Sequence, residues 1–501
     1  MIKENSINLR EKIMRKTQEE QMTFGNVDIS QIKINSKSRD EIDRTVKGLQ
    51  YLYINTEIRK EIFKVLEENI LPKVSKKTGR PGMELWKILV LGVIRQSCSW
   101  DYDKLHHAAN FDMMIRELLG HDKYEWDDRY FYELQTLKDN VSLLTPEVLD
   151  KLNEIVIKTG HNILGGKKKA ELHGSVDSFV LETDVHFPTD ISLLYDSMRK
   201  AISLTARICE SNKISGWRQS RHNINTLKNS LRNIQNIKRF KPLTDARVQK
   251  AYRNYISRSG DLLAKVKETL ILINNSVAIN QMLLLMLMEI EKFINYAEKE
   301  IDQIDRRVFR GETIPHSEKI FSIFEPHTRW ISKGKAGVPV EFGLPVAIIK
   351  DQHGYILDYS IMENTNDVDE AVPLATRAKE KYPALNSCST DKGFWSPQNH
   401  EILVQLFDQL VMPKKGRLNK MQITEETAEE FIRLRRKHSA VESAINGLNH
   451  SGLDKCYDHG LFGLKRCVGL SILARNIHTL GKDVRKKEEK RKRRKTYTKA
   501  A

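Results

Sequence analysis

A long, charged helical stretch separates two groups of strand-like segments, and this arrangement most restricts how the chain can fold. From residue 191 to about 310 the sequence shows helical patterning almost throughout. Two short apolar segments, of the kind that form buried strands, flank this stretch. They are the valine-rich segment 171–183 (ELHGSVDSFVLET) before it and the segment 338–349 (VPVEFGLPVAII) after it. The sequence therefore predicts one sheet whose strands are divided by an all-helical insertion at about 191–315.

The segments that follow extend this sheet. Residues 355–362 (YILDYSIM) form the second arm of a predicted β-hairpin, after the short polar turn 351–354. Two helical patterns then alternate with two strand-like runs, in the order 369–381, 385–390, 397–406 and 410–413. Strands that alternate with helices predict an α/β fold, in which helices pack on a sheet.

The N-terminal part carries helical patterns and a basic loop. Residues 1–75 are predicted to form a helical arm. In the region 76–165, the basic loop KKTGRPG (76–82) precedes helical patterns at 83–94 and 102–109, which a short turn separates. This arrangement resembles a helix-turn-helix DNA-binding unit. A small helical bundle without a DNA-binding role explains the same pattern.

The charge of the chain favours a polyanionic partner. Its formal net charge is +17 at pH 7. Because lysine and arginine neutralise phosphates and release counterions, a protein this basic is expected to bind double-stranded DNA. The alternative is that the charge only keeps the protein soluble. The segment 482–501 is basic with few apolar residues, and it is expected to be a disordered tail.

Several classes of protein are excluded by composition and spacing. The five cysteines show no C-x-x-C spacing, so neither a disulfide framework nor a zinc site is expected. No apolar run is long enough to span a bilayer, which predicts a cytoplasmic protein without a membrane partner. The segment SKGKAG (332–337) lacks P-loop spacing, which argues against a nucleotide cofactor. Its Lys333 and Lys335 are instead candidates for contact with DNA phosphates.

Three acidic residues are candidates for a metal site. Asp177 lies in the middle of a predicted strand, and Asp391 lies where another strand ends and a glycine-containing loop begins. Glu442 borders the apolar stripe of a predicted long helix, from about 424 to 450. Metal-dependent cleavage of DNA needs carboxylates that converge on Mg²⁺ or Mn²⁺. Taken alone, a carboxylate at such a position is more often a helix cap or a member of a salt bridge.

Five segments of the chain resemble sequence blocks of bacterial insertion-sequence transposases with a DDE catalytic triad. They are residues 176–190, 330–343, 389–401, 437–460 and 464–481. The resemblance is to the not-classified-yet insertion-sequence group and covers roughly residues 75–481. It implies an RNase H-like catalytic core at 166–481, with a mixed five-stranded sheet and flanking helices. It also implies that Asp177, Asp391 and Glu442 are the catalytic, metal-binding residues.

The same resemblance implies a function. The expected reaction is metal-dependent cleavage at the ends of a mobile element, followed by transfer of the freed strand into target DNA. Two element ends have to be paired, which favours a homodimer or a higher homo-oligomer on DNA. Two alternatives remain open: a DNA-binding regulator without catalysis, derived from a transposase, and a nuclease of the same fold that cuts and never joins.

The residues before Glu442 are candidates for contact with phosphate. A related group of transposases carries tyrosine, arginine and lysine around this glutamate, whereas the equivalent positions here hold Arg435, His438 and Asn449. The phosphate-binding role is therefore assigned to a group, namely Arg435, Arg436, Lys437 and His438.

Neighbouring residues compete for roles at the site. The acids that lie in the same block as Asp177 are Glu182, Asp184 and Asp190. Asp184 is the substitute if Asp177 is buried and paired. His186 and Asp190 are expected to order the loop beside the site. Trp395 either stacks on an unpaired base or packs in the core.

Overall fold

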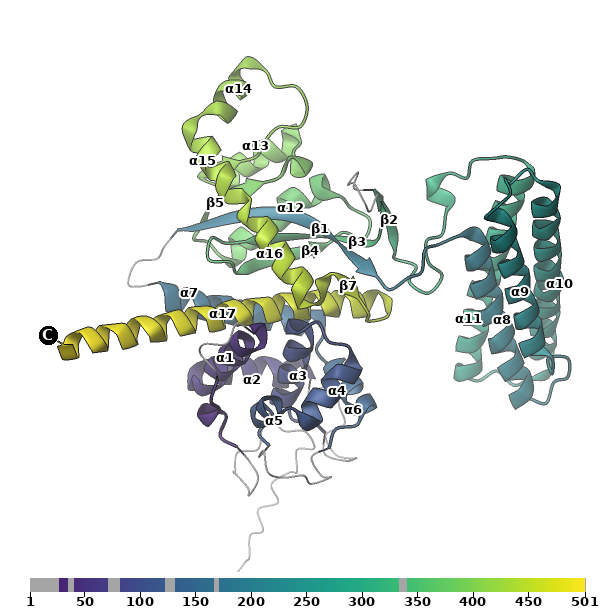
Figure 1. Cartoon of the computed structure of the whole chain (residues 1–501), viewed down its shortest axis with the longest axis horizontal. Coiled ribbons are helices and arrows are strands. Elements are labelled where there is room, and N and C mark those ends of the chain that lie inside the picture. Colours follow the sequence, from purple (N-terminus) through teal and green to yellow (C-terminus); the bar gives the residue numbers. More distant parts are fainter. Residues whose placement is uncertain are drawn as a thin grey trace, which may run out of the picture. The chain divides into compact units, whose positions relative to one another are not determined.

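The computed structural model describes residues 27–34, 40–70, 82–121, 131–165, 171–332 and 340–500. The chain divides into two compact units. The first comprises residues 1–184 and 343–501, and the second comprises residues 185–342 (Figure 1). The basic loop at 76–81 and the two candidates Lys333 and Lys335 lie outside the described residues.

The described strands form one mixed sheet. Their bounds are β1 (Leu172–Thr183), β2 (Arg329–Ser332), β3 (Val340–Lys350), β4 (Ile356–Ile361), β5 (Leu385–Thr390), β6 (Gln409–Val411) and β7 (Lys455–Cys456). The order across the sheet is β2-β3-β1-β5-β6, while β4 pairs with β3 and β7 pairs with β1. Strand β1 is antiparallel to β3 and parallel to β5. The predicted α/β class is thus confirmed, whereas the sheet has seven described strands instead of the five expected, because β4 and β7 add to the five strands of the main order.

Side chains along β1 point alternately to the two faces of the sheet, and each face packs in a separate hydrophobic core. Leu172 and Val176 belong to the large core, which also contains apolar residues of α12 (Asp367–Lys381). Phe179 and Leu181 point to the opposite face, where they pack with Val441 and Leu448 of α16 (Ala440–Leu448). Figure 1 shows α16 lying across the sheet beside β1.

Helices from both ends of the chain complete the first unit. The N-terminal set is α1 (Glu41–Ile54), α2 (Thr56–Ile70), α3 (Leu85–Ser97), α4 (Tyr102–Phe111), α5 (Met113–Leu118), α6 (Leu134–Val141) and α7 (Pro146–Leu164). Helices α3 and α4 match the two predicted helices of the helix-turn-helix-like segment. Nearly every residue of α3 is buried, so α4 is the helix of this pair that has an exposed face.

Two C-terminal predictions differ from the structure. The predicted long helix is divided into α14 (Lys420–Thr427), α15 (Glu429–His438) and α16, because α15 packs on β5 and β6 while α16 packs on β1. The segment expected to be a disordered tail is helical, since α17 (Gly460–Ala500) continues through it. Its buried first half supplies the helix nucleus, and lysine, arginine and glutamate propagate a helix well.

A buried ion network joins α3 to α17. The carboxylate of Asp458 accepts hydrogen bonds from Arg95 at 2.8 Å and from Arg466 at 3.2 Å. The side chains of Arg95 and Asp458 are only 5% and 4% exposed. The guanidinium of Arg95 also lies 4.0 Å from the centre of the Tyr102 ring. These contacts connect the N-terminal helices to the C-terminal helix.

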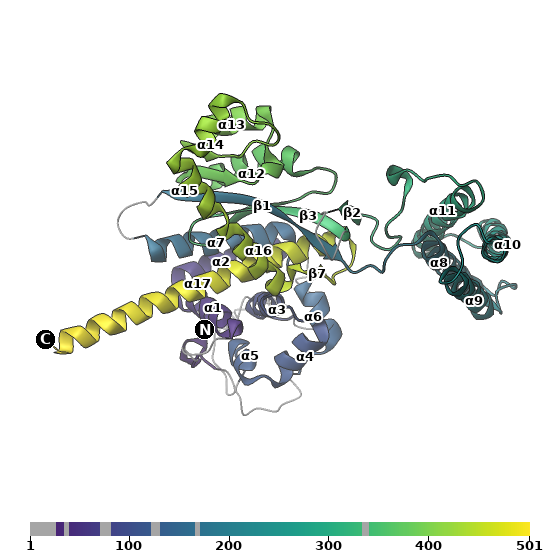
Figure 2. The ribbon, with the colours of Figure 1, turned by 45° about the horizontal axis from the view of Figure 1, so that its top comes forward.

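The second unit contains a helical bundle. Its long helices are α8 (Asp190–Ser211), α9 (Ser220–Lys238), α10 (Ala246–Ser276) and α11 (Gln281–Phe309), which lie side by side in Figure 2. The apolar residues of α9 that enter the core, Leu227, Leu231 and Ile234, follow helical spacing. The bundle occupies the range of the predicted helical insertion. None of the described helices is long and apolar enough to cross a membrane.

Candidate functional site

Strands β1 and β5 bring two of the predicted acids together. In their parallel register Ser175 pairs with Ser389, and Val176 pairs with Thr390. Asp391 is the next residue after Thr390, so it lies at the level of Asp177. Neighbouring residues in register on parallel strands point to the same face of a sheet. This face is the one that α16 covers.

The third acid comes from the helix on that face. Glu442 is exposed in the first turn of α16, whose opposite side packs on the sheet through Val441 and Leu448. The start of α16 is tied to the sheet by Lys350 at the end of β3. Its ammonium group donates a 2.7 Å hydrogen bond to the carbonyl oxygen of Ala440. Glu442 is thereby held at the same face as Asp177.

A fourth carboxylate, which the sequence reasoning missed, joins these three. Asp367 is the first residue of α12, and its charge acts on Asp177. It lies against the loop that follows Asp391, where a Cβ atom at Gly393 would come within 3.0 Å of an Asp367 carboxylate oxygen. Its position after the capping residue Asn366 is ordinary for a helix, which is why the sequence did not single it out.

The four carboxylates concentrate negative charge. The pKa of Asp177 is raised to about 6, first by burial and then by the charges of Asp391, Asp367 and Glu442. The backbone N–H of Ser178, at 2.7 Å, opposes this shift. Among the described residues, no lysine, arginine or histidine forms an ion pair with any of the four. Within the described parts of the chain, the cluster therefore has no ion pair to compensate its negative charge.

Of the predicted phosphate-binding residues that the structure describes, His438 is the one that lies within this cluster. Its Nδ1 is 3.0 Å from the hydroxyl of Ser389, two residues before Asp391. Burial lowers the pKa of His438, although Asp391 and Glu442 act in the opposite direction. The imidazole is thus neutral at pH 7. The other candidates of this group occupy the exposed last turn of α15, namely Arg435, Arg436 and Lys437.

The residues predicted to lie beside Asp177 have other partners. Asp190 pairs with Arg307 at 2.6 Å, and His186 is 3.5 Å from Asp196. Both pairs lie within the second unit, so they organise the start of the bundle instead of the predicted loop beside the acids. Asp184, the substitute for Asp177, is engaged by the ammonium group of Lys455 at 2.6 Å. Asp177 forms no such ion pair with any residue that the structure describes, which favours it as the first acid.

The oxygen atoms of the carboxylate cluster are possible ligands of a divalent metal ion. In the described parts of the chain, no group of three or more histidine, cysteine, aspartate or glutamate side chains is already gathered at metal-binding distance. The chemistry of the cluster nevertheless fits Mg²⁺ or Mn²⁺, which prefer oxygen ligands. The other three carboxylates contribute to the raised pKa of Asp177, and a cation bound beside Asp177 would stabilise its ionised form. The oxygen atoms of Asp177, Asp391 and Glu442 are thus of the kind that these ions prefer, although the three side chains are not gathered around one point.

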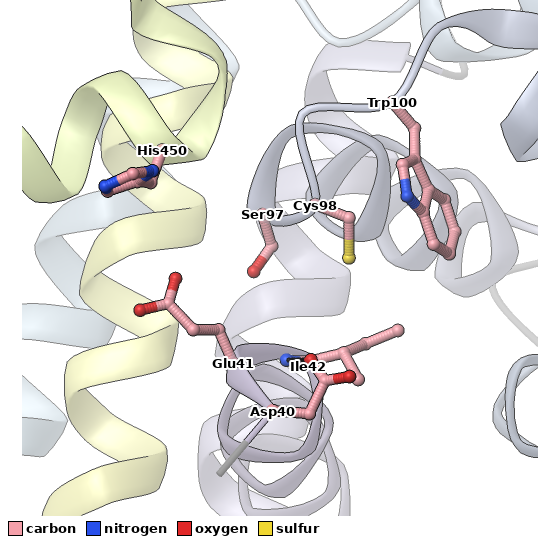
Figure 3. Close-up of a pocket in the computed structure, with 7 residues that line it drawn as sticks. All are labelled: Asp40, Glu41, Ile42, Ser97, Cys98, Trp100 and His450. Carbon is pink, nitrogen blue, oxygen red and sulfur yellow. Dashed lines mark hydrogen bonds between the residues drawn. The ribbon is translucent and has the colours of Figure 1, made fainter.

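Two hollows in the first unit are separate from the three acids. One, of about 470 Å³, is lined by Asp40, Glu41, Ile42, Ser97, Cys98, Trp100 and His450 (Figure 3). Burial, and then the charge of Asp40, raises the pKa of the Cys98 thiol to about 12, so it is no nucleophile at pH 7.

The other hollow, of about 280 Å³, has Trp395 in its wall. The Trp395 ring packs partly against the large core and lies 5.4 Å from the ammonium group of Lys414. Core packing, one of the two roles considered for this residue, is therefore present. Neither hollow offers a set of groups as chemically specific as the four carboxylates.

Comparison of the chain with protein-family models, with curated proteins and with solved structures finds no match in any of the three.

Proposed function

We propose that the chain is a DDE-type transposase, which cleaves DNA at insertion-sequence ends and transfers the freed strand into target DNA. The observation that supports this proposal is the placement of Asp177 on β1, Asp391 directly after the neighbouring strand β5, and Glu442 in the first turn of the helix that packs on the same sheet. These residues come from two neighbouring strands and a helix, far apart in sequence. The mixed sheet, with helices on its faces, is the arrangement expected of an RNase H-like core.

The three carboxylates would hold Mg²⁺ or Mn²⁺. When bound, such ions lower the pKa of water or of a 3′-hydroxyl and neutralise charge on the phosphate under attack. Asp177 lies on β1, and Asp391 directly follows β5, whose last residue pairs with Val176, so the two acids would fix one edge of the site. Glu442 approaches from α16, which Lys350 holds in place.

The protein also supplies groups for holding DNA. Arg435, Arg436 and Lys437 form an exposed basic turn at the end of α15, immediately before the helix of Glu442. Their side chains would contact phosphates next to the scissile bond. The neutral His438 then orients the end of β5 through Ser389, two residues before Asp391. This division of roles separates DNA binding from the chemical step.

A DNA-binding regulator without catalysis is the second candidate that the charge of the chain favours. The carboxylates around Asp177 argue against a regulator, because acids that have no ion pair among the described residues repel DNA and cost stability. A protein that only binds DNA gains nothing from such a cluster. The same reasoning does not separate a transposase from a nuclease, so the test has to detect joined products as well as cut ones.

Cleavage of DNA that carries the element's own ends tests the proposal. Wild-type protein with Mg²⁺ is expected to cut at these ends and to produce joined strands. Asp391→Asn is expected to bind the DNA equally well and to cut on the order of 10³-fold more slowly, the loss of about 4 kcal/mol of transition-state stabilisation.

The matched control is Asp408→Asn, the same change at an exposed aspartate before β6, which should cut normally. Tight binding without cutting by the wild type would favour the regulator. Cutting without joined products would favour the nuclease. Equal cutting by Asp391→Asn and wild type would remove Asp391 from the site.

A further inference from the structure

One end of the helical bundle in the second unit exposes a concentrated apolar surface. It comprises the end of α10, the connection that follows and the first eight residues of α11. Its large apolar side chains, each 49–68% exposed, are Ile271, Leu272, Ile279, Met282, Leu284, Leu285 and Met288. We call this set the apolar tip. Single exposed apolar residues are normal, but seven within one hairpin end mark an interaction surface.

The apolar tip is also free of charge. Charged residues make up 30% of the chain, yet residues 269–288 include no aspartate, glutamate, lysine, arginine or histidine. The exposed polar residues within this segment are uncharged, and they are Asn274, Asn275, Ser276, Asn280 and Gln281. A surface without lysine or arginine has nothing with which to neutralise phosphates, so DNA is not its partner.

A surface without charge is suited to a contact between two copies of this chain. In a symmetric dimer each patch meets the same patch of the other copy, so any charge near the axis would face a like charge. With a net charge of +17 on each copy, most of the surface would repel a second copy. The apolar tip is a place where two copies can meet without that repulsion.

The size of the apolar tip agrees with such a contact. Burying the exposed halves of seven leucine, isoleucine and methionine side chains removes on the order of 300 Å² of apolar surface from water. A standard interface takes about 800 Å² from each partner, of which slightly more than half is apolar. The tip thus provides most of the apolar part, and its amides and hydroxyl provide polar surface.

We infer that the apolar tip is a homodimerisation surface through which two copies of the chain associate. This contact lies within the second unit and does not depend on the carboxylates. The dimer is therefore expected to form without DNA and to persist in Asp391→Asn. A failure of the catalytic proposal and a failure of this inference can be told apart.

Sedimentation of the full chain in the absence of DNA tests the inference. The wild type is expected to be a dimer at micromolar concentration. The double variant Leu285→Glu with Met288→Glu places two like charges on one face of α11 and is expected to weaken association at least tenfold. Phe240→Glu is the control, because Phe240 is 83% exposed next to the opposite end of α10. This variant should remain a dimer.

Cross-linking gives a second readout that does not depend on the stability of the charged variant. Leu285→Cys with a short bis-maleimide should yield a covalent dimer, while Phe240→Cys and the wild type should not. A wild type that is monomeric at every concentration would overturn the inference, as would a glutamate variant that stays dimeric. Monomeric wild type that binds neutral lipid vesicles would assign the tip to a lipid surface instead.

Discussion

Asp177→Asn is expected to abolish metal-dependent DNA cleavage and, without metal, to make the protein more stable. Both effects come from the same cause. The carboxylate of Asp177 is partly buried among three other negative charges, which raises its pKa from 3.8 to about 6. Its ionised form is therefore unfavourable in the folded protein, while a bound cation needs that form.

The pH dependence has a definite sign. Because the folded-state pKa of Asp177 is raised, its favourable contribution is complete below pH 3.8 and is lost as the pH rises through about 6. The rise of the Asp177 pKa from 3.8 to about 6 corresponds to about 3 kcal/mol of lost stability at high pH. This value is the upper limit of the stability that the Asp177→Asn substitution can restore. Asp177→Asn should thus exceed the wild type in stability by ~1–3 kcal/mol at pH 8.

Denaturant unfolding at pH 4 and at pH 8, with cleavage measured in parallel, checks this prediction. The stability difference between Asp177→Asn and wild type should be small at pH 4 and large at pH 8. Cleavage should fall on the order of 10³-fold, as expected when a ligand of a catalytic ion is removed. A variant that is less stable at pH 8 would show that Asp177 serves as a structural residue.

Asp458→Asn is expected to cost about 3–5 kcal/mol in the free energy of unfolding of the first unit, because it leaves buried Arg95 without its counter-charge. The side-chain Nε and Nη1 atoms of Arg95 have no hydrogen-bond partner among the described residues, so little else compensates the charge. The interaction connects α3 with the start of α17, and its loss loosens the N-terminal helices from the C-terminal helix.

The matched control for Asp458→Asn is Asp184→Asn. Asp184 also forms an ion pair, with Lys455, but its side chain is 46% exposed. Exposed pairs contribute about 1 kcal/mol or less, so this variant should unfold close to the wild type. The double variant Arg95→Met with Asp458→Asn should recover part of the lost stability. Equal unfolding of both single aspartate variants would show that the buried network contributes no more than an exposed pair.

Local sequence patterns were sufficient to predict the strands near the site and the helical bundle. The valine-rich run around Asp177 and the strand that ends before Asp391 depend on residues close in sequence. The breaks before and after α15 could not be predicted in this way, because they result from packing on different strands. The helix of the C-terminal tail was missed because a charged composition alone does not show that a buried helix precedes it.

The candidate site was predictable only in part for the same reason. Asp177, Asp391 and Glu442 each stood out through a local feature. Asp367 did not, because an acid in the first turn of a helix needs no further explanation. Its place in the cluster depends on the packing of α12 against the loop around Gly393, which no local pattern shows. The partners of His186 and Asp190 were likewise set by the bundle.

The most direct test of the central claim is equilibrium binding of Mn²⁺, measured by calorimetry on the full chain without DNA. The wild type should bind at pH 8 and bind more weakly at pH 5, where Asp177 is protonated. Replacing even an outer partner of a metal ligand costs about 10–100-fold in affinity, so Asp391→Asn should lose ~100-fold or more, and Asp408→Asn nothing. Equal binding by wild type, Asp391→Asn and Asp408→Asn, at both pH values, would contradict a metal site at these carboxylates.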